Sequence, residues 1–197
     1  MNQKILKPAQ GKKAVCISFV APITDITTQA LLAAVSNATN QGNHEVYLLL
    51  STPGGSVSSG ITAYNTLKTF PVFLTIVNTG NIQSIGNVIY QSGKHRIATP
   101  SSSFMFHGIG FDLPQNTRLE LKDVKERLVS LENDQNLMAN ILAKHTNLDL
   151  QAVNQLFLQM EFVDTDNAIK YGITDEITEV RFPKGQVPIH QIVFNKN

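Results

Sequence analysis

The chain of 197 residues has one cysteine, no tryptophan and no long hydrophobic run. One cysteine cannot build a disulfide framework, and without a CxxC or HExxH motif no zinc site is expected; Cys16, inside AVCISF, is interpreted as a small core residue. Apolar runs such as VYLLL are far shorter than the roughly 20 residues that a membrane span requires. The N-terminus, MNQKILKPAQGKK, lacks the apolar segment of a signal peptide. We therefore expect a soluble, cytoplasmic protein without a metal or another cofactor.

The sequence also lacks an excess of positive or negative charge. Sixteen Lys and Arg residues stand against 15 Asp and Glu residues, which gives a formal net charge of +1. No basic run is interleaved with aromatic residues, so a nucleic-acid partner is not expected. Because 42% of the residues are apolar, the chain can bury one sizeable core. We expect a single domain over residues 1–197.

Strand-like and helix-like segments alternate along the chain. Apolar, strand-like runs occupy residues 12–20, 45–50 and 72–77, and helix-like segments lie between them at 24–42 and 51–70. This alternation is typical of a parallel sheet with crossover helices. The sequence therefore predicts an α/β fold.

A long helix is predicted over about residues 117–145. Thr117 and Glu120 have the spacing of a capping box at its start. From Leu121 to His145, mostly apolar residues recur at alternating spacings of three and four, which makes a narrow stripe like that of a coiled coil. Two interpretations stay open: an ordinary helix that faces the core, or a helix that projects from the domain and pairs with another subunit.

The stretch TPGGSV is the first candidate site. A turn between a strand and a helix start leaves the backbone N–H groups of Gly54, Gly55 and Ser56 without partners inside the helix. Such donors bind a phosphate or form an oxyanion hole. The nucleotide motifs GxxxxGK[ST] and GxGxxG are absent, which disfavours a nucleotide. A plain tight turn remains the third interpretation.

Ser84 and His107 are the next candidates, because each follows an apolar strand-like run. Ligands of open α/β sheets bind at the carboxyl ends of the strands. Ser84 is therefore either a nucleophile or an N-cap residue. The GxSxG elbow of α/β-hydrolases is absent, because Ile82 stands where its first glycine would be. His107 is a candidate base, whereas the other four histidines are interpreted as surface residues.

Three stretches, 48–70, 79–108 and 168–177, resemble in order and spacing the proteolytic subunit of Clp protease, the ClpP family. The resemblance runs from about Ala14 to about Ile177. It implies a crotonase-like spiral of βαβ units with a projecting long "handle" helix, the predicted helix at about 117–145, that interlocks two rings.

The resemblance also implies a site and an activity. Ser84 matches the family's nucleophile, and His107, in the segment MFH, matches its general base. Gly55 and Ile85 match the residues whose backbone N–H groups form the oxyanion hole. The implied function is a serine endopeptidase that cleaves peptides or unfolded proteins inside a homo-oligomeric ring, without a cofactor.

The chain departs from the family's pattern at the third catalytic position. An alignment of residues 145–172 without gaps places Met160 where the aspartate of the triad belongs. The nearest carboxylates are those of Glu161 and Asp164, and either is a candidate for a displaced third member. Two alternatives follow: a catalytically weak or inactive ring subunit, or a crotonase-type acyl-CoA enzyme, which would not need a Ser–His pair.

Both ends of the sequence also depart from the pattern. The segment before Ala14 is short, without the axial loop and first helix that family members use near their ATPase, so an ATPase unfoldase partner is doubtful. Residues 179–197 extend beyond the family's usual end, and the sequence assigns them no role.

Overall fold

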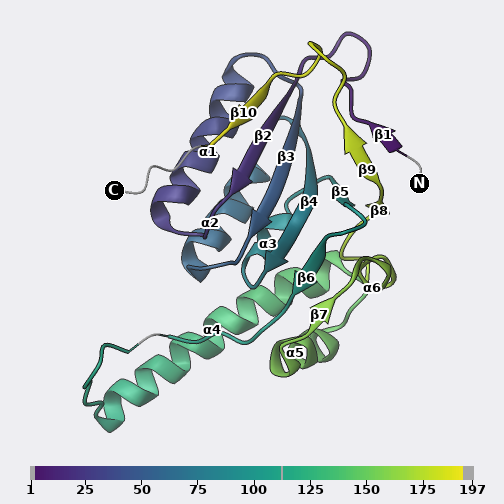
Figure 1. Ribbon diagram of the computed structural model, residues 1–197. Coiled ribbons are helices and arrows are strands. Elements are labelled where there is room, and N and C mark those ends of the chain that lie inside the picture. Colours follow the sequence, from purple (N-terminus) through teal and green to yellow (C-terminus); the bar gives the residue numbers. More distant parts are fainter. Residues whose placement is uncertain (1–2, 112, 193–197) are drawn as a thin grey trace.

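The computed structural model describes residues 3–111 and 113–192, which form a parallel sheet, helices packed on it and one helix that projects from it (Figure 1). The path through the sheet runs β10-β2-β3-β4-β5-β8, and every neighbouring pair on this path is parallel. These strands are β2 (Ala14–Val20), β3 (Glu45–Thr52), β4 (Phe73–Gln83), β5 (His95–Ala98), β8 (Glu176–Ile177) and β10 (Ile189–Gln191). The predicted α/β fold with a parallel sheet is confirmed.

Both faces of the sheet are covered, and the side chains of β3 show how. Successive side chains of a strand point to opposite faces. Leu48 and Leu50 lie in the larger core, which the helices cover. Tyr47, one residue before Leu48, lies in a smaller core together with Cys16, and Leu49, between the two leucines, packs against that core. The continuous apolar run of β3 is therefore that of a strand buried on both sides. The helices over the larger core are α1 (Asp25–Asn40), α2 (Val57–Leu67) and α3 (Gly86–Tyr90).

Helix α1 begins and ends where its sequence predicts. The Thr24 hydroxyl accepts a hydrogen bond from the Thr27 N–H, and the Thr27 hydroxyl accepts one from the Thr24 N–H, so the two residues form a reciprocal cap. Gly42 follows the helix with φ +79°, a backbone conformation that favours glycine. The helix is thereby fixed between β2 and β3.

A smaller layer holds the end of β4. Strand β6 (Ser103–Met105) pairs in parallel with Asn81–Gln83 of β4 and antiparallel with β7 (Phe162–Val163). The carboxyl ends of β4 and β6 therefore meet, and these ends lead directly to Ser84 and His107. Helices α5 (Leu150–Gln159) and α6 (Thr165–Lys170) flank β7 in the sequence.

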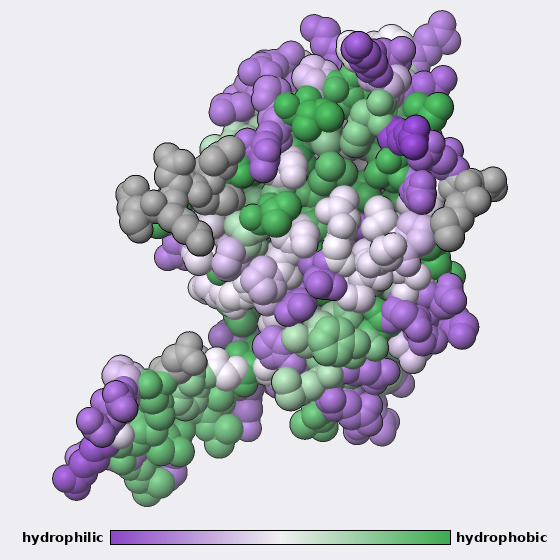
Figure 2. All heavy atoms as spheres, in the orientation of Figure 1, coloured by the Kyte–Doolittle hydropathy of each residue, from purple (hydrophilic) through white to green (hydrophobic). Residues whose placement is uncertain are grey.

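Helix α4 (Leu121–His145) projects from the body of the molecule (Figure 1). Near its C-terminus, Met138, Ala139 and Leu142 are buried in the larger core. Its N-terminal part instead exposes Leu121 and Leu128, and Figure 2 shows hydrophobic side chains along this projecting arm. The first half of the stripe therefore projects from the body and does not face the core, whereas pairing with another subunit stays a prediction.

The expected start of this helix at residue 117 is wrong. Thr117 belongs to a turn, because both its N–H and its hydroxyl donate to the Pro114 carbonyl. The N-cap is Glu120, which forms the capping box with Asp123. The acidic side chain of Asp123 in the first turn also suits the positive end of the helix dipole, which explains the later start.

The C-terminal extension adds strands to the fold. Strand β9 (Glu179–Arg181) pairs in parallel with β1 (Gln3–Ile5), and β10 extends the main sheet beyond β2. The sequence did not assign these strands. Residues 193–197 of the extension lie outside the described residues.

None of the helices in the described part of the chain is long and apolar enough to cross a membrane. Within the same residues, no group of three or more His, Cys, Asp or Glu side chains is arranged to hold a metal ion.

Candidate active site

Ser84 occupies a tight turn between β4 and α3. Its φ is +54°, in the left-handed region that residues other than glycine rarely adopt. Its N–H donates to the Met105 carbonyl at 2.9 Å, which ties the turn to the end of β6. The N-cap of α3 is Ile85, and the Ser84 side chain makes no cap hydrogen bond among the described residues. The interpretation of Ser84 as an N-cap residue is therefore wrong, and a strained turn that presents a hydroxyl is typical of a functional site.

The side chain of Asn87 holds the turn at Ser84 in place. This side chain is fully buried, and its Nδ2 donates to the Ser84 carbonyl at 3.1 Å and to the Met105 carbonyl at 2.8 Å. The amide therefore links the backbone of Ser84 to the strand that leads to His107. Sequence reasoning missed Asn87, although a polar residue three positions after the serine, inside an otherwise apolar helix, was a usable signal.

The two glycines after β3 allow the backbone to approach Ser84 closely. Gly54 has φ +87°, and a Cβ placed on it would lie 2.7 Å from the Ser84 Cβ. Gly55 has φ +144°, and a Cβ there would lie 2.2 Å from the Ile23 carbonyl oxygen. Side chains at these positions would collide with their neighbours. Gly54 is therefore required by the packing against Ser84, and Gly55 by the close contact with the Ile23 backbone.

Of the three backbone N–H groups expected to be free after β3, those of Gly54, Gly55 and Ser56, two have acceptors. The Gly54 N–H donates to the Thr52 hydroxyl at 3.1 Å, and the Ser56 N–H donates to the Ile23 carbonyl at 2.8 Å. Within the described residues, the N–H groups of Gly55 and Ile85 have no hydrogen-bond acceptor. Two such donors beside a nucleophile are what an oxyanion hole needs.

His107 follows β6 with its ring fixed by the backbone. Its Nδ1 lies 2.6 Å from the Gly108 carbonyl oxygen. A carbonyl only accepts hydrogen bonds, so Nδ1 carries a proton and Nε2 of the neutral ring is an acceptor. The Gly108 N–H in turn donates to the Phe157 carbonyl at 3.0 Å, which anchors this segment on α5. The ring is thus held in the tautomer that a general base requires.

Among the described residues, no carboxylate is hydrogen-bonded to His107. Met160 is 64% exposed and ends α5 in a left-handed conformation. Asp164 caps α6, where its Oδ1 accepts from the Asn167 N–H at 2.8 Å. The Glu161 carbonyl accepts from the Phe106 N–H, but its side chain makes no hydrogen bond or ion pair with His107 within the described residues. The Gly108 carbonyl is the only hydrogen-bond partner of the His107 ring within the described residues.

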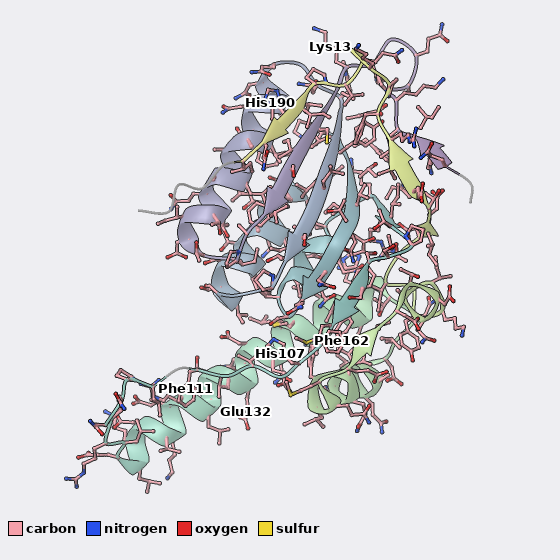
Figure 3. All side chains as sticks on the ribbon, viewed as in Figure 1. Lys13, His107, Phe111, Glu132, Phe162 and His190 are labelled. Carbon is pink, nitrogen blue, oxygen red and sulfur yellow. The ribbon has the colours of Figure 1, made fainter. Side chains whose placement is uncertain are left out.

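Ser84, His107 and Gly55 line one pocket of about 380 Å³. Ser84 and His107 make no hydrogen bond to each other among the described residues, an arrangement common in sites without substrate. One wall comes from α4, beside which His107 and Phe111 lie in Figure 3. This wall includes Asp134, which sequence reasoning missed because its position on a polar stretch of helix resembles an ordinary surface residue.

The remaining titratable candidates lie elsewhere. Cys16 is fully buried in β2, as expected, and burial raises the pKa of its thiol to about 12. His145, expected at the surface, is instead half-buried, and its Nε2 lies 2.7 Å from the Tyr64 hydroxyl. The difference arises because the last turn of α4 packs on α2.

Comparisons with known proteins agree with this architecture. A fold match to a mutant of ClpP1 from Listeria monocytogenes has a TM-score of 0.74 at 18% identity and covers 86% of this chain and 92% of that one. The ATP-dependent Clp protease proteolytic subunits of Lactococcus lactis subsp. cremoris (strain SK11) and subsp. lactis (strain IL1403) are each 26% identical over 167 residues, 83% of this chain and 82% of the relative. The sequence model of Clp protease matches residues 9–181, so β10 lies beyond the matched part. The chain therefore belongs to the Clp protease family, as its sequence motifs predicted.

Proposed function

We propose that this member of the Clp protease family is a serine-type endopeptidase, with Ser84 as nucleophile and His107 as general base. The observation that carries the proposal is that both side chains and the free N–H of Gly55 meet in one pocket. The whole chain, residues 1–197, is proposed to act as one peptidase domain. The comparisons favour neither an inactive ring subunit nor a crotonase-type acyl-CoA enzyme.

The proposed reaction is an acyl transfer in two steps. The Ser84 oxygen attacks the peptide carbonyl carbon while its proton moves to Nε2 of His107. The carbonyl oxygen becomes an oxyanion, which the N–H groups of Gly55 and Ile85 stabilise. When the C–N bond breaks, His107 returns the proton to the leaving amine. Water then hydrolyses the Ser84 ester by the same route, and the site is regenerated.

Gly108 takes over part of the role of the absent aspartate. Its carbonyl keeps the proton on Nδ1 of His107, so Nε2 faces the reaction as a base. A neutral carbonyl stabilises the imidazolium less than a carboxylate does, because hydrogen bonds between charged groups are about twice as strong. We therefore propose a working Ser–His dyad with a lower turnover than a full triad.

A homo-oligomeric chamber is proposed from the surface of α4. Leu121, Val124 and Leu128 lie on one side of the projecting helix and are 71%, 46% and 52% exposed. Apolar side chains in such a row are stabilised when a second copy of the helix covers them. A ring assembled in this way would enclose the pocket and admit peptides or unfolded chains as substrates.

The test is the intact mass of the protein after exposure to a fluorophosphonate. We expect one adduct per chain, located on Ser84, and cleavage of a short fluorogenic peptide. The matched control is Ser84→Ala, which removes a hydroxyl that caps no helix and should keep the thermal transition nearly unchanged. A folded, assembled sample that takes up no label would contradict the peptidase and favour a non-catalytic ring subunit.

A further inference from the structure

The wall of the pocket that α4 forms carries two charged side chains. Helix α4 contributes Arg127, Ser130, Leu131 and Asp134 to the lining. Their spacings of three and four residues place them on one side of the helix. A side chain that enters the pocket beside Ser84 can therefore contact this side of α4.

Arg127 already has a partner, whereas Asp134 does not. The guanidinium carbon of Arg127 lies 4.7 Å from the centroid of the Phe111 ring, in a cation–π contact. Asp134 is half-buried, and its carboxylate has neither a hydrogen bond nor an ion pair in the described part of the chain. The pocket thus contains one unpaired negative charge that is partly removed from water.

Asp134 also lies nearer to Ser84 than Arg127 does. The helix carries Asp134 seven residues beyond Arg127, about 10 Å along its axis. In that direction α4 enters the body of the molecule, where Met138 is fully buried, while its start projects away (Figure 1). Gln135, the next residue, lies close to Gly108, within 3.6 Å of a Cβ placed there. Asp134 is therefore the charged residue of α4 closest to the Ser84–His107 end of the pocket.

We propose that Asp134 is a specificity-determining residue that selects peptides with a lysine or arginine side chain next to the cleaved bond. The inference rests on the proposed peptidase function. An ammonium or guanidinium group would form a charge-assisted hydrogen bond with the carboxylate. An uncharged side chain of equal length would leave the carboxylate unpaired in a partly desolvated site, which is unfavourable. A pocket of about 380 Å³ has room for such a side chain.

The experiment compares matched peptides that differ only at the residue before the cleaved bond: lysine, its uncharged analogue norleucine, or glutamate. Binding is measured on the Ser84→Ala chain and cleavage on the chain with Ser84. We expect lysine to be preferred over norleucine by about tenfold or more. Asp134→Asn should remove this preference, and Asp134→Lys should move it to glutamate. Glu132→Gln is the matched control, because Glu132 is exposed on the same helix and does not line the pocket (Figure 3).

An unchanged ratio of lysine to norleucine binding in Asp134→Asn would overturn the proposal. So would an equal loss of that preference in Glu132→Gln, because it would show a general effect of charge. Failure of the proposed function has a different signature, which is the absence of a fluorophosphonate adduct on Ser84. Because binding is measured on Ser84→Ala, Asp134 is tested whether or not the chain cleaves peptides.

Discussion

The position of the Ser84 hydroxyl depends on a neighbouring residue that has no side chain. Gly54 packs against Ser84 so closely that a Cβ would reach within 2.7 Å of the Ser84 Cβ and 2.9 Å of the Gln83 carbonyl oxygen. On its other side, Ser84 is held by hydrogen bonds from its N–H to Met105 and from Asn87 to its carbonyl. The proposed nucleophile therefore cannot move without breaking contacts that connect it to β6.

Gly54→Ala is accordingly expected to abolish fluorophosphonate labelling of Ser84. The methyl group must displace Ser84, and a displacement of about 1 Å in a reacting group can lower the rate roughly a hundredfold. The control is Gly42→Ala, because Gly42 has a similar φ of +79° but no atom within 4 Å of the added Cβ. Both variants should lose about 1–2 kcal/mol from the left-handed backbone. Equal labelling rates in the two variants would refute the role assigned to Gly54.

At the scale of the element, the apolar stripe of α4 is buried near the C-terminus of the helix and exposed near its N-terminus. Met138 and Leu142 pack into the core, whereas Val124 and Leu128, earlier in the same stripe, are 46% and 52% exposed. The sequence pattern predicted one continuous stripe but could not show where the helix leaves the body, because core and exposed contacts use the same apolar residues. The change occurs near Asp134, at the proposed pocket.

Leu128→Asp, alone or with Val124→Asp, is expected to dissociate the proposed oligomer while leaving the fold intact. Each change would place a charge in an apolar contact between copies, and a charge without a partner is strongly unfavourable there. In a single chain both side chains are largely exposed, so the fold itself loses little. Sedimentation velocity gives the size of the particle, and Asn136→Asp, an exposed change on the same helix, is the control. A wild-type chain that sediments as a monomer would contradict the assembly.

At the scale of the whole molecule, the sequence predicted the repeating pattern of strands and helices but missed individual hydrogen bonds and one strand of the sheet. The order of strands and crossover helices followed from periodicity, and the family motifs indicated Ser84 and His107 as the candidate catalytic residues. The Gly108 carbonyl on His107 and the amide of Asn87 on Ser84 were missed although the partners are close in the sequence, because such contacts depend on backbone and side-chain angles that a residue pattern does not give. Strand β10 was missed because pairing with β2 crosses most of the sequence.

The junction between α4 and the body depends on a histidine that is kept neutral. Lys68 donates to the Tyr64 hydroxyl at 2.9 Å, so the single hydroxyl proton of Tyr64 is free to donate to Nε2 of His145 at 2.7 Å. Burial lowers the pKa of His145, and the nearby charges of Lys68, Arg96 and Lys144 lower it further. If Nε2 of His145 took up a proton, the His145 N–H and the Tyr64 O–H would both be donors that face each other. The hydrogen bond between the two side chains would then be lost.

This junction predicts that the protein loses stability in mild acid. Because the pKa of His145 is lower in the folded chain than its ordinary value of about 6.5, the unfolded chain binds more protons there, and stability falls as the pH decreases below about 6.5. Urea unfolding at pH 7.5, 6.5 and 5.5 gives the free energy of unfolding at each pH, and therefore its slope with pH. His145→Gln keeps an acceptor for Tyr64 without a titrating ring, so its slope should be shallower than that of the wild type. His190→Gln, on the exposed strand β10, is the control, and equal slopes for His145→Gln and the wild type would contradict the prediction.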